Sequence, residues 1–250
     1  MSGTDSKHVS NSDGQHSAHT PLSRNEIAYL VAHDFPDGAV VNLGIGMPTL
    51  VADFLPTDRE ILLQSENGIL GMGGAASGDE VDLDIINASR TPVVLLPGAS
   101  ITEHTIAFAM MRGGHLDYSV LGGFQVAENG DLANWLTSGP GAIAAIGGAM
   151  DLAVGAREVI VMMEHVTKDQ TPKLLTACTY PLTATGVVNT VYTDLAIIDV
   201  TPNGFVVRAI IEGLTVETLA KKTGAALSIS DKLAVISRNE QGDPVYKSAY

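Results

Sequence analysis

The residues best suited to chemistry lie in one short segment, residues 65–74, which reads Ser-Glu-Asn-Gly-Ile-Leu-Gly-Met-Gly-Gly. Its single carboxylate, Glu66, follows an apolar run at residues 60–64 that is typical of a buried strand. The glycines after it predict a tightly bending loop with room for a ligand. Because ligands in open α/β sheets bind beyond the carboxyl ends of strands, Glu66 is a candidate acyl acceptor. The alternative is a solvated charge at a loop end, which is the usual role of a lone glutamate.

Periodic apolar segments predict the elements that must position Glu66. Ser23-Arg-Asn-Glu26 has the pattern of a capping box and predicts a helix that ends near Phe35. Pro48 suits the first turn of a helix running to about Leu55. We expect further helices over residues 102–112, 141–156 and 215–223. Strands are expected at residues 39–43, 60–64, 93–96, 118–121, 159–163, 195–200 and 205–211, with the last two forming a hairpin.

Alternating strands and helices predict a three-layer α/β fold with a mostly parallel sheet. The polar residues 1–21 are expected to be a disordered tail. One domain is expected over residues 22–230, followed by a C-terminal extension over residues 231–250.

Composition excludes several classes of function. The 250 residues carry a formal net charge of −14, which argues against nucleic-acid or anionic-membrane partners. No apolar run reaches the ~20 residues needed to span a bilayer. The only cysteine, Cys178, rules out intramolecular disulfides and favours a cytoplasmic protein. No metal site is expected, because His104, His115 and His165 lack metal-ligand spacing.

Six segments together resemble one enzyme family. The Ser65–Gly68 tetrapeptide resembles the active-site signature of class I coenzyme A (CoA) transferases, in their β-type subunit. Further similar segments lie, in family order, at residues 41–49, 96–100, 111–117, 130–135 and 147–152. The chain is therefore identified as a member of this family over residues 22–224.

The resemblance implies that Glu66 is a nucleophile that forms a glutamyl–CoA thioester. A carboxylate suits this reaction, because its acyl intermediates keep the energy of the donor thioester. Glu103, Asp117 and Glu164 lack the strand-then-glycine context of Glu66. CoA thioester is implied as a substrate, with no permanently bound cofactor. The family also implies an α-type partner subunit, in a heterotetramer of two α and two β chains.

The remaining candidate site residues are those that could bind CoA or stabilise an oxyanion. The Gly147–Gly148 pair resembles the segment that supplies a backbone amide, although simple helix–sheet packing is equally compatible. Asn42 corresponds to an asparagine near the reacting centre, with a turn cap as the alternative. Arg90 is either a ligand contact or a solvated charge. The full set is Asn42, Gly44, Gly46, Asn67, Gly68, Arg90, Gly147 and Gly148.

Resemblance also indicates the substrates. Several segments are most similar to transferases that move CoA from succinyl-CoA to 3-oxoadipate, and an acetoacetate-using transferase is the nearest alternative. An acyl-CoA hydrolase and a non-catalytic CoA-binding module are alternatives of other classes. A dicarboxylate needs a cation for its remote carboxylate. Arg90 and Arg112 are nearest in sequence to the similar segments, and the partner subunit is the other possible source.

Overall fold

The computed structural model describes residues 19–137, 141 and 143–248. The described helices are α1 (Arg24–Asp34), α2 (His104–Arg112), α3 (Ala149–Gly155) and α4 (Val216–Lys221), with the 3₁₀ helices η1 (Met47–Phe54) and η2 (Gly78–Glu80). The described strands are β1 (Val40–Leu43), β2 (Leu62–Gln64), β3 (Ile69–Ala75), β4 (Val93–Ile101), β5 (Tyr118–Gly122), β6 (Gln125–Ala127), β7 (Leu132–Ala133), β8 (Glu158–Met162), β9 (Leu174–Leu175), β10 (Val188–Tyr192), β11 (Ala196–Thr201), β12 (Gly204–Ile211), β13 (Leu227–Arg238) and β14 (Pro244–Ser248).

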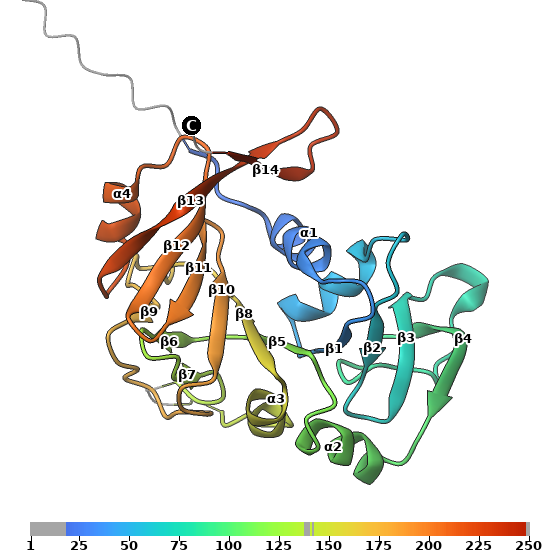
Figure 1. Ribbon diagram of the computed structural model, residues 1–250. Coiled ribbons are helices and arrows are strands. Elements are labelled where there is room, and N and C mark those ends of the chain that lie inside the picture. The colour runs from blue at the N-terminus through green and yellow to red at the C-terminus, as the bar shows by residue number, and fades with distance from the viewer. Residues whose placement is uncertain (1–18, 138–140, 142, 249–250) are drawn as a thin grey trace, which may run out of the picture.

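One sheet of eleven strands organises the described chain, in the order β14-β13-β12-β11-β10-β8-β5-β1-β2-β3-β4 (Figure 1). Its centre, from β10 to β2, is parallel. Antiparallel pairs extend it to β4 on one side and to β14 on the other, where β12 and β13 form one further parallel pair. Strands β7, β6 and β9 form a second, smaller sheet. The α/β architecture expected from the sequence is confirmed.

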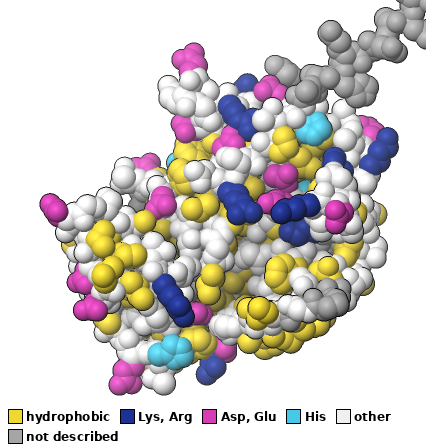
Figure 2. All heavy atoms as spheres, turned by 180° about the vertical axis from the view of Figure 1, so that it is seen from behind, with side chains coloured by type: hydrophobic (Ala, Val, Ile, Leu, Met, Phe, Trp, Pro, Cys, Tyr) yellow, Lys and Arg dark blue, Asp and Glu magenta, His cyan; other side chains and the backbone are white. Residues whose placement is uncertain are grey.

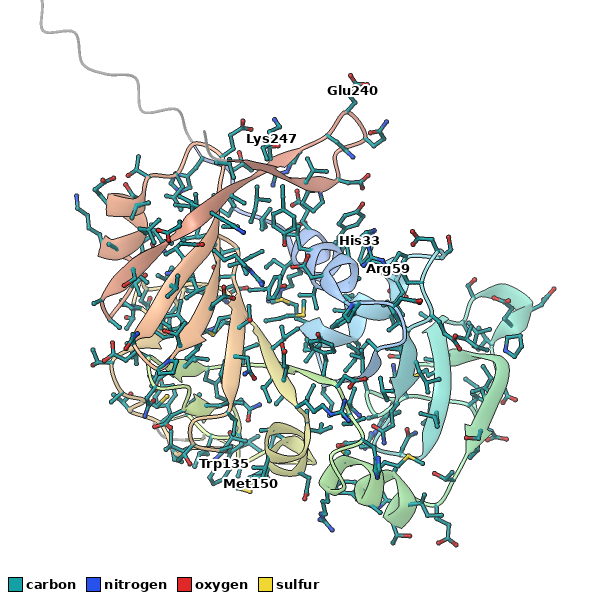
Figure 3. All side chains as sticks on the ribbon, viewed as in Figure 1. His33, Arg59, Trp135, Met150, Glu240 and Lys247 are labelled. Carbon is teal, nitrogen blue, oxygen red and sulfur yellow. The ribbon has the colours of Figure 1, made fainter. Side chains whose placement is uncertain are left out.

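Helices α1 and η1 pack against each other, and α2 packs against α3 on the other side of β1 and β5 (Figure 1). Helix α1 begins with the expected capping box, since Ser23 and Glu26 each accept a hydrogen bond from the other's backbone N–H. Arg59 ties the end of α1 to the sheet by donating to the main-chain oxygens of His33 and Phe35 (Figure 3).

Two expected elements differ from the structure. Residues 69–75 form strand β3, not a glycine-rich loop, because the chain turns back at Glu66–Gly68 and pairs with β2. Their glycines permit close packing: a Cβ on Gly71 would lie 3.0 Å from the Ala99 Cα. Of the helix expected over residues 141–156, only α3 is helical among the described residues. Gly147 has a φ of +47°, which a right-handed helix cannot include.

The C-terminal segment belongs to the main sheet. The expected boundary at residue 230 falls inside β13, which pairs with β12 and β14. Tyr246 of β14 donates a hydrogen bond of 2.9 Å to Asp34 at the end of α1, and Arg238 forms an ion pair with Glu26. The expected tail at residues 1–21 lies largely outside the described residues.

A buried histidine links three separate segments of the chain. His165 is fully buried, and its ring nitrogens contact the hydroxyls of Thr193 (3.0 Å) and Thr223 (2.9 Å). Burial, and then the nearby Lys222 and Lys173, lower the pKa of His165 to about 4. The ring is therefore neutral at physiological pH and has the structural role expected from the sequence.

This histidine should make the protein sensitive to mild acid. Its pKa is lower in the folded state than the 6.5 of an unfolded histidine, so the unfolded chain takes up the proton first. The stability from neutral His165, about 3 kcal/mol, should be present above pH 6.5 and lost as the pH falls towards 4. Urea unfolding of wild type and His165→Gln between pH 7.5 and 4.5 isolates this contribution, with the exposed His115→Asn as control. An unchanged difference in unfolding free energy between wild type and His165→Gln would contradict it.

Candidate functional site

Glu66 lies in the tight turn between β2 and β3. Gly68 closes this turn with a φ of +108°, and a Cβ there would lie 2.1 Å from the Thr102 main-chain oxygen, so only glycine fits. Asn67 holds the turn by donating to the Ile86 oxygen (2.7 Å) and accepting from the Ser65 hydroxyl (2.6 Å). Asn67 and Gly68 thus fix the backbone that presents Glu66, and neither lines the cavity into which the Glu66 side chain opens.

The half-buried Glu66 side chain opens into a cavity of about 580 Å³. The cavity lies where β1, β5 and β8 end and where residues 145–149 lead into α3. Of the residues predicted from the sequence, it brings together Asn42, Gly44, Glu66, Gly147 and Gly148.

The Glu66 carboxylate lies against Gly148. A Cβ on Gly148 would be 2.0 Å from Glu66 Oε2 and 3.3 Å from the ring of Phe108. Within the described chain, no hydrogen bond or ion pair engages this carboxylate, whereas Glu164, also at the cavity, pairs with Arg24 at 3.0 Å. Glu66 is therefore the cavity carboxylate that is free to react.

The other carboxylates considered from the sequence are less suited to this role. Asp117 pairs with Arg157 at 2.7 Å, and Glu103 is exposed at the start of α2. Cys178 is half-buried, and burial raises its pKa to about 11, so its thiol is unreactive at neutral pH.

Asn42 is buried beside the cavity and contacts Gln64, its neighbour across the parallel pair β1–β2. Its Nδ2 donates to the Gln64 main-chain oxygen (3.0 Å) and to Gln64 Oε1 (2.6 Å). The sequence pattern indicated Gln64 only as the end of a strand. A polar residue closing an apolar run was the available signal.

The glycines after β1 have separate roles. Gly44 donates a hydrogen bond of 2.8 Å to the Val120 oxygen, and a Cβ at Gly44 would lie 2.9 Å from that oxygen. Gly46 has a φ of +89°, immediately precedes η1 and does not line the cavity.

The cations expected from the sequence do not reach this cavity. Arg90 is exposed on the loop before β4, with a φ of +63°. Arg112 forms an ion pair of 2.6 Å with Asp151. The cations that line the cavity are instead Arg24 and Lys173.

Lys173 is the cavity cation that forms no ion pair with any described residue. It is half-buried, and desolvation lowers its pKa, although Glu164 and Asp194 counteract this. Arg24, by contrast, already pairs with Glu164. No sequence motif indicated Lys173, because the folding of distant segments alone brings it to the cavity.

The described residues contain no group of three His, Cys, Asp or Glu side chains arranged to hold a metal ion. None of the described helices combines the length and apolarity needed to cross a membrane.

Comparison with known proteins identifies the family of this chain. The family model described as coenzyme A transferase matches residues 24–222. One subunit of 3-oxoadipate CoA-transferase from Acinetobacter baylyi is 52% identical over 206 residues, covering 82% of this chain and 95% of the relative. The subunit of the same name from Pseudomonas putida is 53% identical and covers 82% and 96%.

More distant relatives share the family but are named for other substrates. One subunit of succinyl-CoA:3-ketoacid coenzyme A transferase from Helicobacter pylori is 42% identical, covering 82% of this chain and 99% of the relative. Among solved structures, an acyl-CoA transferase (YdiF) from Escherichia coli O157:H7 has a TM-score of 0.67 at 19% identity. That match covers 86% of this chain and 43% of the YdiF chain, and it supports the fold alone.

Replacing Gly148 by alanine should disable the site without unfolding the chain. Gly148 has a φ of −84°, which alanine adopts without strain, but the new Cβ would displace the Glu66 carboxylate. A misplaced reacting group costs on the order of 100-fold in rate. We expect that loss in the CoA exchange rate of Gly148→Ala, with its melting temperature near that of the wild type. An unchanged exchange rate would show that Glu66 does not react from this position.

Proposed function

The chain belongs to the coenzyme A transferase family, and we propose that it is the subunit whose Glu66 carries CoA from succinyl-CoA to 3-oxoadipate. The observation that carries the proposal is Glu66, unpaired within the described chain, in a cavity at the carboxyl ends of β1, β5 and β8. Coenzyme A enters as part of the substrate, and the proposal includes no resident cofactor.

The reaction starts when a Glu66 oxygen attacks the thioester carbonyl of succinyl-CoA. The C–S bond breaks, which leaves a succinyl–glutamyl anhydride and CoA thiolate. The thiolate then attacks the glutamyl carbonyl, so that succinate departs and a glutamyl–CoA thioester remains. The carboxylate of 3-oxoadipate repeats these two steps in reverse and restores Glu66, so atoms and charge balance without ATP.

Each tetrahedral intermediate carries an oxyanion that needs fixed N–H donors. The backbone at Gly147 and Gly148 is suitable, because Gly148 lies against the Glu66 carboxylate. With no side chain at residue 148, the carboxylate can approach the main chain closely.

Relatives support 3-oxoadipate over acetoacetate as the acceptor. The Acinetobacter baylyi and Pseudomonas putida relatives, named for 3-oxoadipate, are 52% and 53% identical to this chain, against 42% for the Helicobacter pylori relative named for 3-ketoacids. Lys173 provides a cation in the cavity for the remote carboxylate that 3-oxoadipate has and acetoacetate lacks.

A second kind of chain is part of the proposal, since each of these relatives is named as one subunit of its transferase. We expect a heterotetramer of two α-type and two β-type chains, located in the cytoplasm. Large apolar side chains on β4 and at α2 are exposed, notably Leu96, Ile101 and Ile106. Hydrophobic side chains also gather in patches on the face shown in Figure 2, and such patches commonly mark protein interfaces.

Glu66 should become covalently modified during turnover. The complex, purified with its partner subunit, is incubated with succinyl-CoA and treated with borohydride, and the modified peptide is mapped. We expect the label on Glu66, and a loss of several orders of magnitude in exchange rate for Glu66→Gln. Glu103→Gln is the matched control and should keep both the label and the rate. Labelling elsewhere, or normal exchange by Glu66→Gln, would refute the proposed function.

Lys173 should determine the preference for a dicarboxylate acceptor. A charge-assisted hydrogen bond contributes about 1.5–3 kcal/mol, so Lys173→Met should lower kcat/KM for 3-oxoadipate roughly tenfold to hundredfold. The same variant should leave kcat/KM for 3-oxohexanoate, which has the same chain length without the second carboxylate, nearly unchanged. In a ping-pong reaction kcat/KM for the acceptor reports only the acceptor half, so the donor does not interfere.

The partly exposed Lys222, which contacts Gln170 at 2.9 Å, provides the control variant Lys222→Met. Equal losses for both acceptors in Lys173→Met would assign Lys173 a structural role. A wild-type enzyme that prefers acetoacetate would overturn the choice of 3-oxoadipate.

A further inference from the structure

The orientation of the Asn42 amide is set by a chain of hydrogen bonds that ends on a main-chain carbonyl. Gln64 Nε2 donates to the Ala107 oxygen of α2 at 3.3 Å. A carbonyl can only accept, so the nitrogen of Gln64 must face Ala107 and its Oε1 must face Asn42. The Gln64 main-chain oxygen faces Asn42 as well.

Asn42 consequently turns its nitrogen away from the ligand space. Both hydrogen bonds of Nδ2 go to Gln64, at 3.0 Å and 2.6 Å. Asn42 Oδ1 makes no hydrogen bond with any residue that the structure describes. Among the described side chains, the polar atoms that are inaccessible to solvent and lack a hydrogen-bond partner belong to Ser89, Ser119 and Ser237. Asn42 Oδ1 is not one of them, so this unpaired oxygen has accessible surface. Because Asn42 lines the cavity, Oδ1 is open to it.

A free amide oxygen selects a ligand group that can donate. The carboxylates and oxo groups of the two acids only accept hydrogen bonds at neutral pH. The pantetheine arm of a CoA thioester carries two amide N–H groups. Of the proposed substrates, only the CoA portion therefore matches Asn42 Oδ1.

We propose that Asn42, held by Gln64, accepts a hydrogen bond from a pantetheine amide of the CoA thioester and does not donate to the oxyanion. This inference rests on the proposed function. Gln64 is a positioning residue, since it touches Asn42 and α2 and is absent from the residues lining the cavity. Stabilisation of the oxyanion is then left to main-chain N–H groups or to the partner subunit.

The test uses succinyl thioesters of CoA analogues in which one or the other pantetheine amide nitrogen is replaced by a methylene group. Loss of one neutral hydrogen bond that leaves a buried acceptor unpaired costs roughly tenfold. We expect the wild-type complex to lose roughly tenfold in kcat/KM with one analogue. Asn42→Leu should already have a lower kcat/KM than the wild type with natural succinyl-CoA, and that analogue should lower its kcat/KM no further. Gln64→Met, which frees Asn42 to rotate, should also be less sensitive to the analogue than the wild type.

Asn134 provides a matched control. It lines the same cavity, but its Oδ1 already accepts from the Thr183 hydroxyl at 2.6 Å, so Asn134→Leu should keep the wild-type sensitivity to the analogue. A wild type indifferent to both analogues would overturn the inference without needing any variant to fold. So would an Asn42→Leu variant that loses the same additional factor as the wild type. Covalent labelling of Glu66 by natural succinyl-CoA is read in parallel, so failure of the proposed function is recognised separately.

Discussion

The parallel pairing of β1 with β2 and β5 is the constraint on which the site depends. It places Asn42 beside both Gln64 and Ser119, and it brings the carboxyl ends of the strands to one edge of the sheet. Two residues beyond Gln64, the chain turns and presents Glu66. A shift of one residue in this register would turn Asn42 to the opposite face and break its contacts with Gln64. The nucleophile and the amide network are therefore consequences of a single pairing.

Electrostatics within the described chain explain how an acidic protein can still receive anionic substrates. Several of its arginines are engaged by carboxylates, as Arg112 is by Asp151 and Arg157 by Asp117. These pairs are largely exposed and contribute little to stability. Lys173, by contrast, lines the cavity and forms no ion pair with any described residue. The positive charge available to a ligand is thus local, despite a net charge of −14.

Local patterns predicted the parts of this structure that depend on neighbours in the chain. The capping box at Ser23, the strand that ends at Gln64 and the position of Glu66 all follow from short segments. The glycines after Glu66 were misinterpreted as a loop, because glycine permits both a bend and the close strand packing seen in β3. Gln64 was predicted only as the end of a strand, and Lys173 was not predicted as a site residue. Their roles arise from contacts between segments far apart in the sequence, and no local pattern encodes the direction of an amide.

The turn that carries Glu66 also determines which motions can accompany a catalytic cycle. Its backbone is fixed on both sides: the Ser65 N–H donates to Ile69, the Gly68 N–H to Ser65, and the Thr102 N–H to Gly68. These main-chain hydrogen bonds restrain the backbone that carries Glu66. Rotation about the side-chain bonds of Glu66 is therefore the direct way for its carboxyl group to adjust between free carboxylate, anhydride and thioester. The reacting side chain can thus move while its backbone support stays in place.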